Sequence, residues 1–149
     1  MINMKRLLLL VTIILGGCSG TGSYYDFRDN MTDGMALSYY DTNGLCRLKD
    51  AHATLKGNWM AGGLKEWPDN QRRLLKLIKA KGTFSDEEME LIESRKIRIG
   101  MSELATYCSW GFPIDTNDSV GSWGRHRQAV MGRDTYFYFE NGELKSWQN

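Results

Sequence analysis

Apolar positions in the central part of the chain recur with a helical period. Segment 70–82 carries an apolar stripe made of Leu74, Leu75 and Ile78. Pro68-Asp69 precedes this stripe as a start signal and Gly82 follows it as a stop signal, so the pattern predicts one amphipathic helix. The same segment is rich in basic residues, namely Arg72, Arg73, Lys76, Lys79 and Lys81.

Two further helices are predicted from their capping residues. Ser85 is a suitable N-cap, and Glu88 three residues later completes a capping box. Ser102 is the N-cap of the next helix. Gly111 is expected to end that helix, and Pro113 prevents it from continuing. The apolar side of this last helix consists of Met101, Leu104, Ala105 and Cys108.

The end of the chain is aromatic and rich in turn signals, which is typical of β-strands. We predict strands over 128–131, 135–140 and 143–147, preceded by a polar loop over 115–124. Asn141-Gly142 predicts a two-residue hairpin, because both positions of its turn require positive φ. The whole pattern predicts an α+β fold, in which N-terminal helices precede two helices and an antiparallel three-stranded sheet.

The two-residue turn also predicts the register of the final hairpin, with Tyr136 opposite Trp147. One face then consists of Phe137, Phe139 and Leu144. The other face consists of Tyr136, Tyr138, Lys145 and Trp147. We expect the first face to pack on helices. The second is aromatic but tipped with polar groups, as interfacial surfaces are, and is a candidate partner-binding surface.

Residues 35–63 give weaker signals. Met35, Ala36, Leu37 and Tyr40 favour a helix, which Thr42-Asn43-Gly44 is expected to end. A second weak helix is predicted over 48–55. No internal repeat is present in the sequence.

The first seventeen residues predict a signal peptide. Lys5 and Arg6 precede an apolar run of about nine residues, whereas a bilayer span needs about twenty. The run ends in Leu15-Gly16-Gly17-Cys18-Ser19, which resembles the bacterial lipoprotein box. The resemblance implies cleavage before Cys18, acylation of Cys18 and, with Ser19 next, sorting to the outer membrane. The alternative is an ordinary secretory signal with a chance cysteine.

Composition limits the function classes. Removal of 17 residues from the 149 leaves 132, which is one domain's worth. That part carries 17 basic and 18 acidic residues. A balance near zero gives no support for nucleic-acid binding, which needs a concentrated basic surface. Residues 18–34, rich in Gly, Ser, Thr, Asp and Asn, are predicted to form a tether between the lipid and the fold.

Two cysteines remain once Cys18 is assigned to the lipid. Cys46 and Cys108 can form a disulfide, because the compartment beyond the inner membrane is oxidising. The alternative is a pair of buried free thiols, since cysteine is a common small core residue. The sequence alone leaves both open.

The segment from residue 84 to the C-terminus resembles the SmpA/OmlA family, whose BamE-like module occurs in small outer-membrane lipoproteins. The likeness is carried by Ile97-Arg-Ile-Gly100-Met101-Ser102, by Trp110-Gly111-Phe112-Pro113 at matching spacing, and by the hairpin Tyr138-Phe139-Glu140-Asn141-Gly142. It implies an α+β module over 84–149 that acts in envelope assembly or integrity without catalysis.

The chain departs from that family in three places. Ala105 and Thr106 replace the family's acidic or amide residue and valine, so the cap at Ser102 lacks its acidic partner. Ala129-Val130 replaces the usual tryptophan before the hairpin. Residues 24–83 have no counterpart in the family's minimal domain, and residues 35–83 are predicted to form a mainly helical N-terminal extension.

Catalytic and metal chemistry have little support in the sequence. A nucleophilic Ser102 needs a base, and the two histidines, His52 and His126, lie in no motif. Capping explains Ser102, and an apolar helix face or a disulfide explains Cys108. No cluster has metal-ligand spacing and no glycine-rich loop matches a phosphate cradle, so no cofactor is expected.

We therefore expect a lipid-anchored, non-enzymatic interaction module on the periplasmic face of the outer membrane, with an envelope protein as partner. A prophage-encoded envelope modifier is a variant of this hypothesis. Besides the aromatic face, the candidate binding residues are Arg125, His126 and Arg127. The alternative interpretation of these three residues is a solvated loop over 124–127. The basic helix at 70–82 is a candidate for contact with anionic lipid, with a solvated face as its alternative.

A second hypothesis is an envelope hydrolase or small-ligand-binding lipoprotein. Its site would lie between the N-terminal extension and the C-terminal module. Its support in the sequence is limited to the two histidines and the serines beside Trp110 and Trp123.

Overall fold

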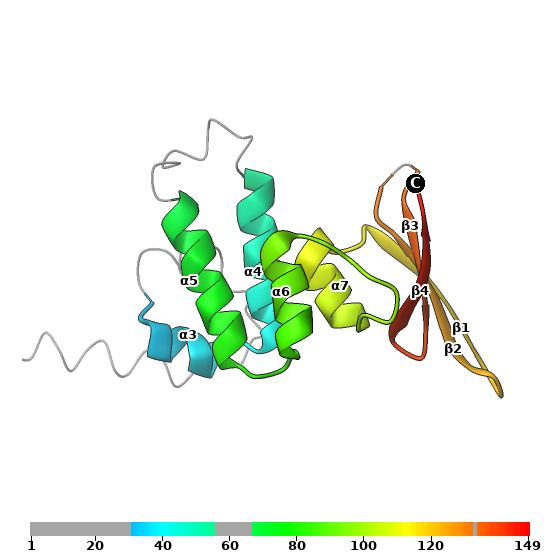
Figure 1. Cartoon of the computed structure of the whole chain (residues 1–149), viewed down its shortest axis with the longest axis horizontal. Coiled ribbons are helices and arrows are strands. Elements are labelled where there is room, and N and C mark those ends of the chain that lie inside the picture. The colour runs from blue at the N-terminus through cyan, green and yellow to red at the C-terminus, as the bar shows by residue number, and fades with distance from the viewer. Residues whose placement is uncertain (1–30, 56–66, 133) are drawn as a thin grey trace, which may run out of the picture.

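The structure, a computed structural model, describes residues 31–55, 67–132 and 134–149. The predicted signal peptide, Cys18 and the tether up to residue 30 lie outside these residues. The elements are α3 (Asp33–Tyr39), α4 (Thr42–Leu55), α5 (Trp67–Ala80), α6 (Asp86–Ser94), α7 (Glu103–Trp110), β1 (Asp115–Gly121), β2 (Gly124–Val130), β3 (Tyr136–Glu140) and β4 (Glu143–Gln148). The α+β prediction is confirmed: α7 lies between the other helices and the sheet (Figure 1).

The prediction that Thr42-Asn43-Gly44 ends a helix is wrong, because these residues open α4. The Asp41 carboxylate accepts a hydrogen bond of 2.6 Å from the Gly44 backbone N–H, as an N-cap does. The preceding helix α3 ends at Tyr39, and its C-cap Tyr40 has an extended backbone. The turn signal in the sequence therefore marked a boundary correctly, but the boundary is the start of a helix.

The capping prediction for α6 and α7 is confirmed. The Ser85 hydroxyl accepts from Glu88 N–H and the Glu88 carboxylate accepts from Ser85 N–H. The other oxygen of Glu88 accepts from the Ser102 N–H at 2.9 Å. Ser102 in turn accepts from the Ala105 N–H. The acidic partner missing from the Ser102 cap is thus supplied by the neighbouring helix.

The sheet has four antiparallel strands in the order β1-β2-β3-β4, so the prediction of three strands is wrong. The additional strand is β1, which lies in the segment predicted as a polar loop. All but the last of its seven residues are exposed. A strand at an uncovered sheet edge needs no alternation of apolar and polar residues, and this explains why the pattern did not reveal it.

A β-bulge corrects the predicted register of the last hairpin. Phe139 pairs with Leu144 as expected, but Tyr138 then pairs with Ser146 and Lys145 is the extra residue. Beyond a bulge every side chain changes face. Trp147 therefore pairs with Phe137 on the face toward the helices, not with Tyr136.

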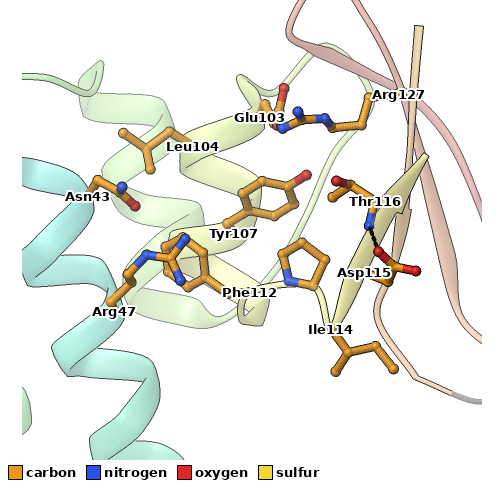
Figure 2. A pocket seen from close by; sticks show the side chains of 11 residues that line it. Asn43, Arg47, Glu103, Leu104, Tyr107, Phe112, Ile114, Asp115, Thr116 and Arg127 are labelled. Atoms are coloured by element: carbon orange, nitrogen blue, oxygen red, sulfur yellow. Dashed lines mark hydrogen bonds and ion pairs between the residues drawn. The ribbon is translucent and has the colours of Figure 1, made fainter. Parts of the chain in front are cut away.

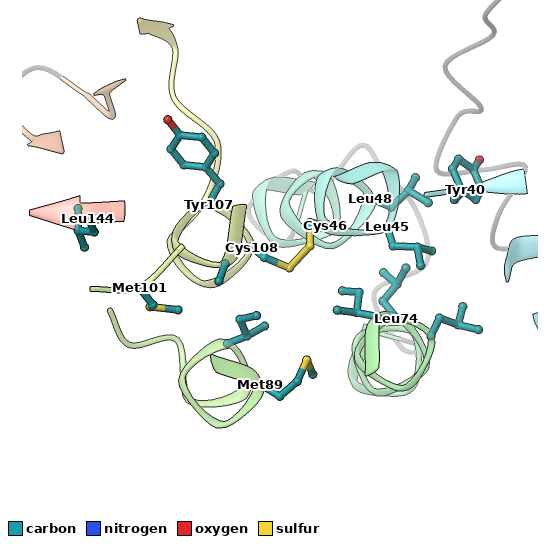
Figure 3. Packing of buried hydrophobic residues seen from close by; sticks show 14 of the residues in the cluster. Tyr40, Leu45, Cys46, Leu48, Leu74, Met89, Met101, Tyr107, Cys108 and Leu144 are labelled. Atoms are coloured by element: carbon teal, nitrogen blue, oxygen red, sulfur yellow. A yellow bond between two sulfur atoms is a disulfide. The ribbon is translucent and has the colours of Figure 1, made fainter. Parts of the chain in front are cut away.

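A single apolar core runs from the N-terminal helices to β4. Figure 3 shows its helical part, where Leu45 of α4, Leu74 of α5 and Met89 of α6 converge. The Cys46–Cys108 disulfide joins α4 to α7 in this core, with a Cα–Cα distance of 4.9 Å. The N-terminal helices and the segment from residue 84 onward therefore share one hydrophobic interior.

Two polar contacts beside the disulfide reinforce the joint between α4 and α7. The Lys49 ammonium, 3% exposed, donates to the Cys108 carbonyl at 2.7 Å. The Asp50 carboxylate accepts from the Phe112 N–H at 3.3 Å and lies close to Gly111. Gly111, at φ 132°, is required there by its conformation and by this close approach.

Part of the basic surface of α5 has a structural role. Arg73 pairs with the Asp33 carboxylate at 2.7 Å and also donates to the Met31 carbonyl. Lys81 donates to the Leu37 carbonyl at 2.6 Å. Both cations hold α3 against α5, which favours the structural interpretation of these two residues over a lipid-binding one.

Lys49 provides a test of the α4–α7 joint through pH. Burial, with a further contribution from the nearby Arg95, lowers the pKa of Lys49 from 10.5 to about 8, while Asp50 opposes this shift. Between these values the unfolded chain binds more protons than the folded chain, so the free energy of unfolding should rise with pH. We expect a rise of up to about 2 kcal/mol from pH 8 to 10 in urea denaturation, and a flatter profile for Lys49→Met.

The matched control is Lys76→Met, which removes an exposed lysine from α5. It should keep the wild-type rise. Identical pH profiles for wild type and Lys49→Met would contradict the buried position of the Lys49 ammonium. The window stops at pH 10 because the raised pKa of Tyr107 lowers stability at higher pH.

Candidate functional site

A groove of about 690 Å³ lies between α4, α7 and the start of β1. Figure 2 shows α4 along one wall and β1 along the other, with Tyr107 and Phe112 between them. The residues that line the groove are Asn43, Arg47, Glu103, Leu104, Tyr107, Phe112, Pro113, Ile114, Asp115, Thr116 and Arg127. Its lining combines apolar side chains with charged ones.

The floor of the groove is aromatic. The rings of Tyr107 and Phe112 lie 5.6 Å apart in a tilted arrangement. The Arg47 guanidinium lies over the Phe112 ring at 4.1 Å from its centre, which is the geometry of a cation–π contact. Ile114 at the rim is 76% exposed, so the groove opens onto an uncovered apolar side chain.

An ion network closes the end of the groove beside the sheet. Arg127 of β2 contacts Glu103 of α7 at 2.5 Å and Asp118 of β1 through two nitrogens at 2.6 and 2.5 Å. Arg125 lies 3.7 Å from both carboxylates. The hydrogen bond from Arg127 lowers the pKa of Asp118 below its usual value. Arg127 thereby links the helix α7 to the outermost strand.

The Tyr107 hydroxyl is a buried polar group without a hydrogen-bond partner, on a side chain that is 6% exposed. It lies close to Glu103 and Arg127 but outside hydrogen-bond geometry to either. Burial, together with the nearby Glu103 carboxylate, raises the pKa of Tyr107, so the hydroxyl stays neutral and is a donor at physiological pH. A buried donor without an acceptor lowers the stability of the fold, and such groups are rare in folded proteins.

The six sequence-predicted binding residues fall on opposite faces of the sheet. His126, Tyr136 and Tyr138 lie on the outer face, as their pairing positions show. The remaining three, Arg125, Arg127 and Trp147, lie on the face toward the helices. The structure therefore does not bring the six together, and only Arg127 lines the groove.

The outer face of the sheet carries a hydrogen-bonded row of polar side chains. Asn117 donates to Gln128 at 3.0 Å, Gln128 to Tyr138 at 3.2 Å, and Tyr138 to Gln148 at 3.4 Å. This row crosses all four strands. The polar tips of this face satisfy one another, which is typical of a solvated sheet surface.

Trp147 takes part in a second, smaller cavity of about 290 Å³ on the other face. Trp110 at the end of α7 and Phe137 of β3 line it too, with their rings 5.9 Å apart. Arg95 and Lys96 complete its rim. The bulge in β4 is what moves Trp147 into this position.

Sequence reasoning missed Arg47, Tyr107 and Ile114 as site residues. Arg47 and Tyr107 each adjoin a cysteine of the disulfide, so the pairing of Cys46 with Cys108 was the signal that could have found them. Ile114 follows the helix stop at Gly111 within a short apolar run. Four separate elements, α4, α7, β1 and β2, contribute to the lining, and no local sequence motif indicates that they meet.

The described part of the chain shows no group of three or more histidine, cysteine, aspartate or glutamate side chains placed to hold a metal ion. In the same residues, none of the helices has both the length and the apolar character that a membrane crossing requires.

No protein-family model, curated protein or solved structure matches this chain. The likeness to the SmpA/OmlA family therefore stays a prediction from motif spacing. The case for a function depends on the groove and on the motifs at the start of the chain.

The unpartnered hydroxyl of Tyr107 predicts an unusual response to its removal. Tyr107→Phe should leave the free energy of unfolding unchanged or raise it by up to about 1 kcal/mol, because no hydrogen bond is lost. Ser109→Ala is the matched control on the same helix, since its buried hydroxyl donates to the Leu91 and Lys96 carbonyls. That variant should lose about 1 kcal/mol or more in urea denaturation. A comparable loss for Tyr107→Phe would show that its hydroxyl has a partner.

Proposed function

We propose that this protein is a lipid-anchored, non-enzymatic interaction module on the periplasmic face of a bacterial outer membrane. It binds an envelope protein through the groove between α4, α7 and β1. The observation that carries the proposal is this groove, with Arg47 on its Phe112 ring and the uncovered Ile114 at its rim.

The anchor is supported by the start of the sequence. A basic segment, a short apolar run and Gly16-Gly17-Cys18 are the parts that signal cleavage and acylation require. More than one acyl chain on Cys18 makes anchoring stable, since a single chain binds membranes only marginally. Residues 19–30 provide the length between the lipid and the first described residue.

A protein partner is supported by exposed apolar side chains along the β1–β2 hairpin. Val120 is 75% exposed and Trp123 is 64% exposed, on a hairpin that projects from the body of the molecule (Figure 1). Ile114, before the other end of β1, is a separate exposed apolar side chain at the rim of the groove, and the polar residues 115–119 lie between the two. Exposed apolar surface next to a groove and rimmed by charge is typical of an interaction site.

A non-catalytic function is supported by the roles that the candidate nucleophiles already have. Ser102 caps α7 and Cys108 is bonded to Cys46. His126 lies on the outer face of the sheet, whereas the groove lies on the other side. None of these groups is placed against another as a nucleophile and its base would be.

A small-ligand-binding lipoprotein is the second candidate. The groove volume of about 690 Å³ falls in the range of ligand pockets. The two candidates differ in what they require of β1: a small ligand fills the groove alone, whereas a protein also covers the exposed residues of the strand.

Site-specific photo-cross-linking in intact cells tests the proposed function. A photoreactive amino acid at Thr116, which lines the groove, should give a specific adduct with an envelope protein identified by mass spectrometry. The control position is Ser146, which is exposed on β4 at the other edge of the sheet. Cys18→Ala should abolish both the membrane fractionation and the adduct. Absence of an adduct at Thr116, or equal adducts at both positions, would contradict this function.

A further inference from the structure

We propose that the groove receives an extended segment of the partner protein, which adds to the free edge of β1 as a fifth strand. An apolar side chain of that segment packs on Phe112 and Ile114, and a carboxylate two residues away binds Arg47. This inference rests on the proposed function and specifies the chemistry of its partner.

One edge strand of the sheet is covered by another segment of the chain and the other is not. This difference favours β1 as the strand to which a partner segment adds. The start of β4 is covered by the segment before α7: Gly100 N–H donates to the Leu144 carbonyl at 2.8 Å and Leu144 N–H donates to the Met101 carbonyl at 2.9 Å. β1 is the other outermost strand and pairs with β2 on one side, and no strand among the described residues pairs with its other side. The Thr116 N–H beside the groove donates to the Asp115 carboxylate at 2.8 Å, and an added strand leaves or replaces this contact. The rest of the edge is a template for an added strand.

The groove lies next to that open edge. Thr116 of β1 forms one wall and α4 forms the opposite wall, as Figure 2 shows. A chain hydrogen-bonded to β1 would therefore run over the floor made by Tyr107 and Phe112. A strand of the length of β1, seven residues, spans about 23 Å, so the site suits an extended segment better than a compact ligand.

Arg47 supplies the charge complementarity. It is exposed, it lies over the Phe112 ring, and no carboxylate among the described residues is within ion-pair distance of it. Arg127 at the other end of the groove is already bound by Glu103 and Asp118. A guanidinium held over a ring and open to solvent is suited to take a carboxylate from a partner.

Tyr107 is the second observation at the same site. Its side chain lines the groove and is more than nine-tenths buried, and its neutral hydroxyl has no acceptor. The hydroxyl is shielded from solvent and lies close to Glu103 and Arg127. An incoming backbone carbonyl, the acceptor that this donor lacks, therefore reaches it once one of these side chains moves aside. The missing hydrogen bond of Tyr107 in the floor of the groove is explained if the hydroxyl gains its acceptor when the partner segment binds.

The recognition pattern follows from strand geometry. Alternate residues of a strand face the same side, at about 6.6 Å spacing for positions i and i+2. We assign an apolar residue at position i to the surface of Phe112 and Ile114. We assign an aspartate or glutamate at i+2, in either direction, to Arg47, whose guanidinium lies 4.1 Å from the centre of the Phe112 ring. The residue between them faces away and is free to vary.

Peptide display on the full chain, extracted from membranes in detergent, tests this inference. A library of random seven-residue peptides should enrich sequences with an acidic residue two positions from an apolar one. Synthetic peptides of the enriched sequence should bind Arg47→Gln at least tenfold more weakly than wild type in fluorescence anisotropy. Arg72→Gln, which removes an exposed arginine of α5 outside the groove, should bind them normally.

Two further measurements separate strand addition from simple charge attraction. Methylation of alternate backbone nitrogens of the peptide should weaken binding at least tenfold, and Tyr107→Phe should weaken it several-fold while the thermal midpoint of the free protein is kept. The inference is overturned if no sequence is enriched, if Arg47→Gln binds as well as wild type, or if the methylated peptide binds unchanged. An adduct at Thr116 together with any of these results would leave the interaction module standing without this mode of recognition.

Discussion

The Cys46–Cys108 disulfide is the constraint on which the rest of the structure depends. It bonds α4, one of the N-terminal helices, to α7, the helix that lies next to the sheet (Figure 3). The loop it closes spans 62 residues, which is worth about 4 kcal/mol in the chain-entropy description. Arg47 and Tyr107 are the neighbours of its two cysteines, so the bond also sets the position of the α4 wall relative to the aromatic floor of the groove.

Around this bond, backbone groups at helix ends are satisfied by side chains from other helices. Lys49 binds the Cys108 carbonyl near the end of α7, and Asp50 binds the Phe112 N–H just beyond it. At the start of α7, Glu88 of α6 binds the Ser102 N–H. Each end of this short helix is thus held by a different neighbour. A helix of eight residues is marginal alone, so its position depends on these contacts.

Local signals in the sequence predicted the elements whose cause is local. The caps at Ser85 and Ser102 were found because capping needs only a few consecutive residues. β1 was missed because an exposed edge strand has no apolar alternation, and Trp147 was misplaced because a bulge cannot be seen in a hairpin pattern. The groove was out of reach for another reason: α4, α7 and β1 meet through a cysteine pairing that the sequence left open.

The redox state of Cys46 and Cys108 in the native protein tests the central claim most directly. Free thiols are alkylated in denaturant during extraction from the cell envelope, and the chain is then digested and mapped by mass spectrometry without reductant. One linked peptide pair that contains Cys46 and Cys108 is the expected result, since it requires both an oxidising compartment and the α4–α7 contact. Recovery of both cysteines in alkylated form would contradict the joint, and with it the groove that depends on it.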